Sequence, residues 1–233
     1  MSDCEVVVIG SVNMDLYSIV SRMPLEGETL ASEHYIQTPG GKAVNQAVAA
    51  ARMGRKTALI GRVGRDAFGQ EIKNRLLQDG IAQHLIVSEK DPTGVSFILM
   101  DQHGNNSIIT NLGANKTFSI ADAKSSLAIA KQAKIALLQL EMEKETRDFI
   151  LKELRKHGIK IILNLAPVVE MSTDVRRLAD ILVVNRVEAE QLTNQEITDK
   201  ASAKRAADLL FSEGNEIIII TLGAEGVLVK HKS

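Results

Sequence analysis

The sequence lacks tryptophan, has a single cysteine (Cys4), and only 3% of its 233 residues are aromatic. One cysteine excludes an internal disulfide and is compatible with a reducing compartment. Scarce aromatic side chains and a formal net charge of −1 argue against a nucleic-acid binder. The apolar runs are short, and the first ten residues do not have the pattern of a signal peptide. We therefore expect a cytoplasmic protein without a membrane span.

Several familiar motifs are also missing. A P-loop would need Gly at position 36 and Ser or Thr at position 43, where this chain has Ile36 and Ala43. The glycine-rich stretches 61–69 and 221–226 do not form a complete dinucleotide fingerprint after the first strand. The five histidines have no metal-ligand spacing, and there is no G-x-S-x-G elbow. These absences exclude P-loop, zinc-site and serine-hydrolase interpretations.

Short β-branched runs alternate with helical patterns along the chain. The runs are apolar throughout, which is typical of parallel strands covered on both faces. Repeated strand–helix order predicts an α/β fold with a doubly wound, mostly parallel sheet. The predicted strands are 5–10, 57–61, 135–139, 160–164, 181–184 and 216–221, and the predicted helices are 42–53, 66–78, 119–132, 144–157, 186–193 and 199–213.

Two segments, about 16–38 and 93–110, interrupt this rhythm. They alternate apolar with polar residues and contain turn residues, a pattern that predicts antiparallel strands outside the main sheet. We interpret them as excursions from one domain over 1–233 that form a small antiparallel β lid over the carboxyl edge of the main sheet. The second face of this lid would need a partner.

The stretch "TPGGKAVNQAVAAARMG" (38–54) opens a helix in an unusual way. Gly40 and Gly41 allow close backbone approach, and the first-turn N–H groups favour negative charge or an acceptor-rich ligand. Lys42 and Asn45, three residues apart, fall on one helix face. The stretch therefore predicts a site for a hydroxyl-rich or anionic ligand. A Pro-Gly turn followed by a capped helix and a solvated lysine is the alternative.

Polar side chains follow successive predicted strands, where ligands bind in doubly wound sheets. An amide and a carboxylate two residues apart after the first strand suit hydrogen bonds to sugar hydroxyls. Each such residue alone could be a helix cap or could bond its own backbone, but the series predicts a site. The residues are Asn13, Asp15, Glu141, Asn164, Asn185 and Glu188.

A series of motifs runs in order along nearly the whole chain: "GSVNMD", "GETL", "GGKAVNQAVAAARMG", "GRVGRDAFG", "TGVSFILMD", "GAN", "QLE", "NLAP", "VVNRVEAEQLT" and "ITLGAEGV". In these motifs the chain resembles the ribokinase branch of the PfkB carbohydrate kinases. The resemblance implies an α/β kinase that uses ATP and Mg²⁺ to phosphorylate a sugar hydroxyl. Ribose, converted to ribose 5-phosphate, is the favoured substrate. The lid face formed by 16–38 and 93–110, which would need a partner, predicts a homodimer formed through the β lid.

The resemblance also assigns roles to residues. The expected sugar-binding positions are Asn13, Asp15, Gly40, Gly41, Lys42, Asn45 and Glu141. Asn185 matches the family's N-x-x-E motif near the phosphates, with Glu188 as its magnesium residue, and Thr221, Gly223 and Gly226 match the nucleotide-side turn. Three departures are small: Ala43 replaces a usual third glycine, Arg186 is added beside the phosphates, and "NLAP" replaces "NPAP".

The largest departure from the family is a missing segment. The D-T-x-G-A-G-D-like motif, which supplies the anion hole and the catalytic base, does not occur in the sequence. We therefore expect an incomplete domain, with the base, a possible K⁺ site and helices over one sheet face beyond Ser233. No catalytic residue is assigned within the chain. A non-catalytic sugar-binding or dimerising remnant of such a kinase is the alternative.

Overall fold

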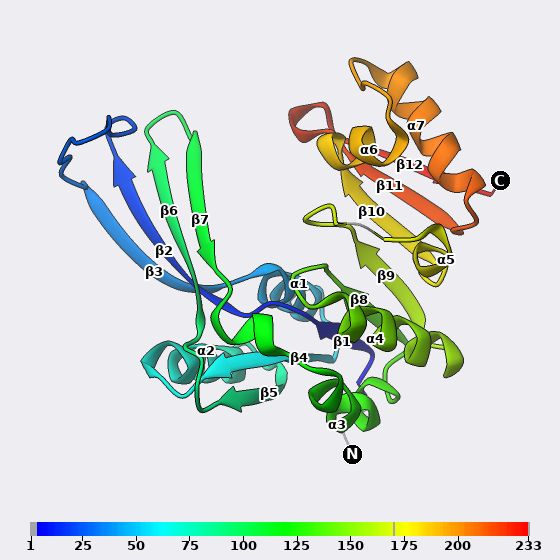
Figure 1. The fold of residues 1–233 in the computed structure, drawn as a ribbon, viewed down its shortest axis with the longest axis horizontal. Helices are drawn as coiled ribbons and strands as arrows, with labels where there is room; N and C mark the ends of the chain where they lie inside the picture. Colours follow the sequence, from blue (N-terminus) through cyan, green and yellow to red (C-terminus); the bar gives the residue numbers. More distant parts are fainter. Residues whose placement is uncertain (1–3, 170, 233) are drawn as a thin grey trace.

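The computed structural model describes residues 4–169 and 171–232. Within these residues the main sheet has eight strands in the order β12-β11-β10-β9-β8-β1-β4-β5 (Figure 1). All neighbours pair in parallel except β11 and β12. The predicted, mostly parallel sheet is confirmed. The strands are β1 (Val6–Ile9), β4 (Thr57–Gly64), β5 (Ala82–Ser88), β8 (Ile135–Leu138), β9 (Lys160–Asn164), β10 (Ile181–Asn185), β11 (Ile217–Thr221) and β12 (Val227–His231).

Helices cover both faces of this sheet. Val6 and Val8 of β1 pack in one core cluster beneath α1 and α2, whereas Val7 and Ile9 pack in another beneath α3, α4, α6 and α7. Fully burying one such side chain contributes about 1.5–3 kcal/mol. The helices are α1 (Lys42–Arg52), α2 (Ala67–Gln78), α3 (Ile120–Ala130), α4 (Lys144–Lys156), α5 (Thr173–Arg176), α6 (Arg186–Thr193) and α7 (Lys200–Ser212), with 3₁₀ turns η1 (Gly113–Thr117) and η2 (Gly223–Glu225).

The strands β9 to β12 are covered on one face only within the described residues. Burial alternates along β9, β10 and β11, so every second side chain remains partly exposed. Val183, Ile219 and Val229 form one row across three of these strands, and Val229 is 52% exposed. Cover on both faces thus holds for β1 and β4, but not for β9–β12 within the described residues. The helices α1 and α2 pack mainly against β1, β4, β5 and β8.

The second sheet is built from the two segments that interrupted the sequence pattern, as predicted. Its order is β3-β2-β6-β7, with β2 (Asn13–Val20), β3 (His34–Gly40), β6 (Gly94–Asp101) and β7 (Asn106–Asn111). The β2·β3 and β6·β7 pairs are antiparallel, and the central β2·β6 pair is parallel. Asn13, Asp15 and Gly40 therefore belong to the lid strands themselves.

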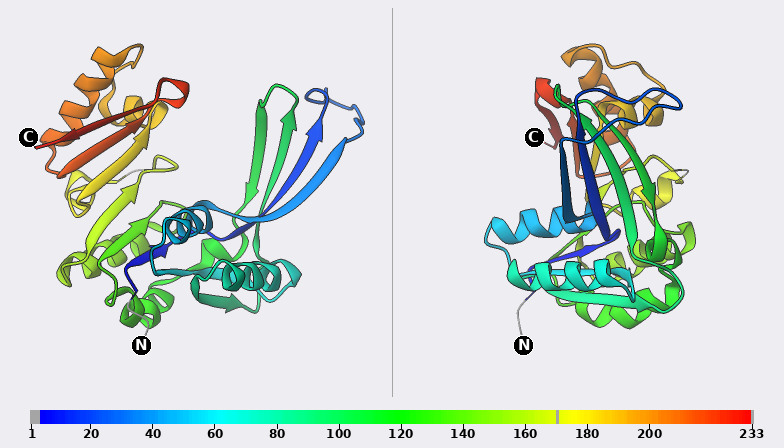
Figure 2. Two further views of the ribbon diagram at one scale, coloured as in Figure 1. Left: turned by 180° about the vertical axis from the view of Figure 1, so that it is seen from behind. Right: turned by 90° about the vertical axis from the view of Figure 1, so that its left-hand side faces the viewer.

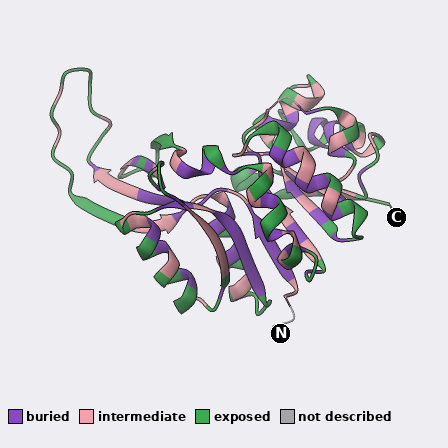
Figure 3. Ribbon diagram, turned by 60° about the horizontal axis from the view of Figure 1, so that its bottom comes forward, coloured by how far each residue is buried: buried purple, intermediate pink, exposed green. Residues whose placement is uncertain are grey.

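The lid stands away from the main sheet and faces the β9–β12 end across the molecule (Figures 1 and 2). Its tip and outer strands are exposed, whereas the strands at the centre of the main sheet are buried (Figure 3). None of the helices in the described part of the chain is long and apolar enough to span a bilayer.

Candidate functional site

The start of α1 lies directly against the end of β1 because Gly41 has no side chain. Its φ of +89° is unfavourable for other residues, and a Cβ there would lie 2.7 Å from the Ser11 carbonyl oxygen and 2.9 Å from the Asn13 nitrogen. The close approach lets the Lys42 N–H donate to Ser11 Oγ at 3.2 Å. The two glycines thus bring the helix N-terminus to the carboxyl edge of the sheet.

Lys42 and Glu141 form an ion pair across this edge. The Lys42 ammonium donates to Glu141 Oε1, and the Ser11 hydroxyl donates to Oε2. The three side chains come from α1, from the segment after β8 and from the segment after β1. Residues separated widely in sequence therefore meet at the place that the sequence predicted for Lys42 and Glu141.

Asp15 is a buried carboxylate with an unused oxygen. The residue is 8% exposed, and its carboxylate packs on Gly40 so closely that a Cβ at that position would collide with it. In the described part of the chain, Oδ1 has no hydrogen-bond partner. Burial raises the pKa of Asp15, hydrogen bonding from Ser96 and the charge of Lys42 lower it, and the charge of Glu141 raises it. An unpaired buried acceptor is costly, so this oxygen indicates a ligand.

A cavity of about 290 Å³ opens beside Asp15, between β2, β3, α1 and α2. Asn45, another predicted residue, lines it with Asp15, while Lys42 and Glu141 do not. The cavity mixes carboxylate, amide, guanidinium and hydroxyl groups, which together offer both donors and acceptors. Its lining is Asp15, Tyr17, Thr38, Pro39, Val44, Asn45, Val48, Ala49, Arg52, Arg75, Leu76 and Asp79.

Asn13 is fixed by two residues to which sequence reasoning gave no role. Its Oδ1 accepts from Asn115 Nδ2 at 2.8 Å, and its Nδ2 donates to Ser96 Oγ at 3.3 Å. Asn13 and Asn115 are each 2% exposed, and Ser96 is 6% exposed. The "GAN" and "TGVS" motifs were the available signals, but neither identifies which side chain its residues contact.

A second group of predicted residues lies at the ends of β10 and β11. Asn185 and Glu188 form a capping box on α6: Asn185 N–H donates to Glu188 Oε2 at 2.7 Å, and Glu188 N–H donates to Asn185 Oδ1 at 2.8 Å. The alternative interpretation of these two residues as a helix cap is therefore confirmed. Burial raises the pKa of Glu188, while the Asn185 N–H and the charge of Lys42 lower it. Within the described residues, Glu188 Oε1 accepts no hydrogen bond.

The turn from β11 to β12 completes this second group. Thr221 stands beside Asn185 in the β10·β11 register. Gly223 and Gly226 have φ values of +61° and +97°, and a Cβ on either would meet nothing within 4 Å. These glycines thus satisfy a backbone conformation and leave open space above the turn.

A chain of amides runs between the elements that carry the two groups. Gln139, which is fully buried, donates through Nε2 to Gln46 Oε1 at 2.5 Å. Gln46 Nε2 donates to Asn164 Oδ1 at 3.4 Å, and Asn164 Nδ2 donates to the Val183 carbonyl at 3.3 Å. The chain runs from the end of β8 through α1 to β9 and β10. Gln46 and Gln139 were not predicted, because their contacts cross four separate elements.

The model of the pfkB family of carbohydrate kinases matches residues 3–233. The chain belongs to this family. It is 38% identical over 226 residues to a ribokinase of Haemophilus influenzae, covering 97% of this chain and 74% of that protein. It is 35% identical over 228 residues to a deoxyribokinase of Salmonella typhi, covering 96% and 74%.

A solved structure of Arabidopsis thaliana ribokinase, complexed with ribose and ATP, has the same fold. Its TM-score to this chain is 0.85 at 28% identity, over 98% of this chain and 75% of that one. The likeness spans both sheets of the kinase fold described above.

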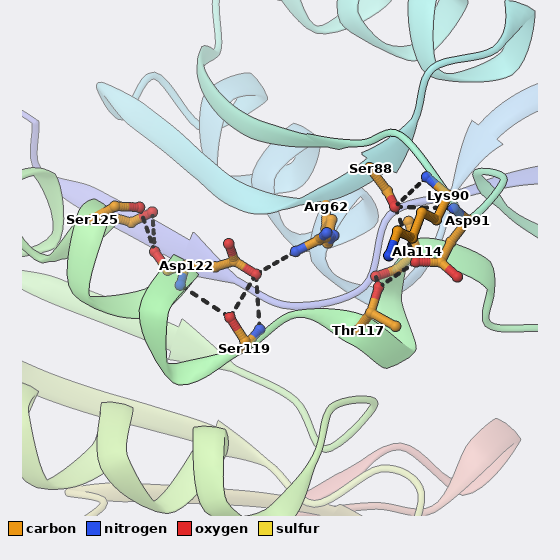
Figure 4. Close-up of polar contacts among 10 residues, drawn as sticks. Arg62, Ser88, Lys90, Asp91, Ala114, Thr117, Ser119, Asp122 and Ser125 are labelled. Carbon is orange, nitrogen blue, oxygen red and sulfur yellow. Dashed lines mark hydrogen bonds and ion pairs between the residues drawn. The ribbon is translucent and has the colours of Figure 1, made fainter.

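A further polar cluster of this kinase chain lies at the base of the lid, beyond the predicted site (Figure 4). Arg62 donates to Asp122 at 2.5 Å, and Asp91 accepts from Thr117 at 2.8 Å and from Ser88 at 2.9 Å. These side chains pair with one another rather than pointing to a cavity. The cluster therefore anchors η1 and the segment that leads into β6.

Proposed function

We propose that this chain carries the sugar site of an ATP-dependent pentose kinase whose preferred substrate is ribose and whose product is ribose 5-phosphate. The observation that carries the proposal is the buried Asp15 carboxylate, with one oxygen unpaired beside a cavity. The ribokinase and deoxyribokinase relatives support a pentose as the sugar.

In this proposal the sugar is held by side chains and backbone at the carboxyl edge of β1 and β8. The ionised Asp15 accepts hydrogen bonds from sugar hydroxyls, while Asn45 supplies an amide that can donate and accept. Asn13 contributes the donor and acceptor positions of its amide that Ser96 and Asn115 do not use, and the Lys42–Glu141 pair supplies a further donor and acceptor. Because Gly40 and Gly41 have no side chains, the Asp15 carboxylate and the backbone of Ser11 and Asn13 can pack directly against them.

We assign the nucleotide to the ends of β10 and β11. Asn185, Thr221, Gly223 and Gly226 surround an open turn with room for a ligand. Arg186, which pairs with Glu225 at 2.7 Å, adds positive charge there.

The magnesium ion expected with ATP would be held by Glu188. The described residues contain no group of three or more His, Cys, Asp or Glu that could hold a metal by themselves. A single carboxylate with a free oxygen nevertheless fits Mg²⁺, which protein sites bind through one or two carboxylates plus phosphates and water. When bound, the ion would neutralise charge on the phosphates.

The carboxylates described above are assigned to binding, and none is proposed as the catalytic base. Phosphoryl transfer depends on positioning and charge neutralisation, and general-base assistance adds about 10²–10⁴-fold. We therefore propose that the base, with any K⁺ site, comes from a segment outside 1–233, and that these residues alone bind sugar without useful turnover.

The lid is proposed to pair with the lid of a second copy. Several large apolar side chains of the lid are exposed, and their burial would drive association. They are Tyr35, Ile36, Phe97, Ile108 and Ile109.

The proposal is tested by calorimetric titration with ribose, 2-deoxyribose and fructose, and by ADP release with ribose, ATP and magnesium. We expect tightest binding of ribose. We also expect ADP release only from a version extended through a D-T-x-G-A-G-D-like segment. Absence of binding to any pentose would refute the sugar assignment. Comparable turnover by the 233-residue polypeptide, at equal folded concentration, would show that the base lies within it.

A further inference from the structure

Four residues form one polar row across the whole width of the lid. Asp15 on β2 stands opposite Thr38 on β3 and opposite Ser96 on β6, and Ser96 stands opposite Thr110 on β7. The side chains of such in-register residues point to the same face of a sheet. The row therefore places three hydroxyl groups on the same lid face as the Asp15 carboxylate.

The neighbouring rows show that this polarity is local. One step further from the main sheet, the row contains Ile36, Tyr17, Ile98 and Ile108. One step closer to it, Asn13 stands between Gly40 and Gly94. The serine and threonine hydroxyl groups on this face are thus in the same row as the carboxylate, and the next row contains isoleucines and Tyr17.

Ser96 has the contacts needed to orient Asp15. It is 6% exposed, and its Oγ accepts from Asn13 Nδ2 at 3.3 Å and from Thr110 Oγ1 at 3.4 Å. A serine hydroxyl has two acceptor positions and one donor. Because both acceptor positions are used, only the hydroxyl proton of Ser96 remains to be donated, and Asp15 stands opposite Ser96 on the neighbouring strand. This direction agrees with the effect of Ser96, which lowers the pKa of Asp15 against the rise caused by burial.

Asn115 sets the direction of these hydrogen bonds from the base of the lid. Its Oδ1 accepts from Val12 N–H at 2.8 Å, which fixes its Nδ2 toward Asn13 Oδ1 at 2.8 Å. The same Nδ2 also approaches the carbonyls of Val12 and Leu112 at 3.0 and 2.9 Å. Asn13 must then present its own Nδ2 to Ser96. The hydrogen bonds therefore run from Asn115 to Asn13 and from Asn13 to Ser96.

We propose that Ser96 is a positioning residue of the sugar site, which acts through Asp15 from the neighbouring lid strand while Asn115 sets the direction of its hydrogen bonds. The inference rests on the proposed function, because it takes Asp15 as the sugar-binding carboxylate. Strand β6 thereby contributes to sugar affinity through the side chain that it places opposite β2.

The main test is ribose titration of Ser96→Ala across pH. Loss of a hydrogen bond to a charged group predicts about a 5- to 20-fold higher Kd for ribose. The acid limb of binding should also move to higher pH, since the pKa of Asp15 loses a lowering influence. Ser96→Thr, which keeps the hydroxyl, should restore both. The other charged or titratable groups around Asp15 are unchanged in these variants: Tyr17, Lys42, Arg52, Arg75, Asp79 and Glu141.

Two further variants separate positioning from general damage to the lid. Ser107→Ala makes the same chemical change on the other face of the lid, at an exposed position on β7, and should leave the Kd unchanged. In an Asp15→Asn background, Ser96→Ala should cause little further loss, because its effect passes through the missing charge.

The outcomes distinguish this inference from the proposed function. If the wild type binds ribose but folded Ser96→Ala has the same Kd and pH profile, the positioning role is refuted while the proposed function stands. If the wild type binds no pentose, the proposed function fails and the inference fails with it.

Should Ser96→Ala unfold, Thr110→Val provides a milder probe. It removes one donor to Ser96 and should weaken ribose binding in the same direction, and an unchanged Kd would count against the network.

Discussion

Two regions of the carboxyl edge of the main sheet are built in different ways. We call them the β1–β8 end and the β10–β11 end, after the strands that carry them. At the β1–β8 end, side chains from separate elements bond one another, as in the contacts among Ser11, Lys42 and Glu141. At the β10–β11 end, Asn185 and Glu188 bond only across one helical turn, and the adjacent glycine turn is open. One end is thus fixed by tertiary structure and the other by local structure.

This difference bears on binding energetics. A site whose side chains are already restrained loses less conformational entropy when a ligand arrives. We therefore expect the β1–β8 end to bind its ligand with little rearrangement, and the β10–β11 end to order on binding. Each of the following predictions compares the ends, tests one of them or tests the lid.

The largest difference should appear in a pair of glycine substitutions. Gly41→Ala imposes a left-handed conformation and a clash with the Ser11 carbonyl, and we expect a loss of about 3 kcal/mol in the free energy of unfolding. Gly223→Ala imposes the same kind of conformation without a clash and should cost about 1 kcal/mol. Urea denaturation measures both. Equal losses would contradict the contrast between a packed end and an open one.

Asp15→Asn should weaken ribose binding by about 10- to 100-fold, because a charged acceptor is lost. The same variant should have a higher Tm near neutral pH. Burial raises the pKa of Asp15 above its unfolded value of 3.8, so its contribution to stability falls as pH rises through that window. Calorimetric titration and thermal unfolding from pH 4 to 8 provide the measurement. An unchanged Kd would remove Asp15 from the sugar site.

Lid association should respond to substitutions at the exposed end of β7. Ile108 and Ile109 point to opposite faces of the lid and are 55% and 73% exposed. If the lid pairs with a second copy, sedimentation at micromolar concentration should show a dimer. Either Ile108→Lys or Ile109→Lys should convert it to monomer, depending on which face is covered. A monomeric wild type, or a dimer that withstands both changes, would argue against a lid interface.

The smallest effect is expected at Arg186. Its ion pair with Glu225 joins two partly exposed side chains, and such pairs contribute less than about 1 kcal/mol. Arg186→Met should leave the urea midpoint almost unchanged, whereas it should weaken ATP binding, which fluorescence titration can follow. A large loss of stability would show that the β10–β11 end is more tightly built than its contacts indicate.

The local sequence pattern was sufficient to predict most helices and strands, including the helix that starts after Gly41 and the strands of the two lid segments. The edge strand β5 was missed because Gln83 and His84 interrupt its apolar run, and α5 is only one turn long. These failures concern weak local signals.

The contacts within the candidate site were less predictable than the residues. Asp15 was selected because it follows a strand. Ser96, which stands opposite it, lies 81 residues later in the sequence, and the two meet because β2 and β6, from separate segments of the chain, pair in parallel. A shift of one residue in that register would place Ser96 on the other face of the lid. Sequence alone does not fix such a register, so Ser96 and Asn115 had to come from the structure.

The parallel pairing at the centre of the lid has a mechanical consequence. Strands β2 and β6 both leave the body of the protein, and β3 and β7 both return to it, so all four attachments lie along one edge (Figure 1). A flap attached along its full width bends about that edge and resists twisting. Asn13, Gly40 and Gly94 lie on the bending line, where displacement is smallest. The lid tip can therefore swing to admit a ligand, while the residues at the base of the lid that are proposed to bind this ligand move very little.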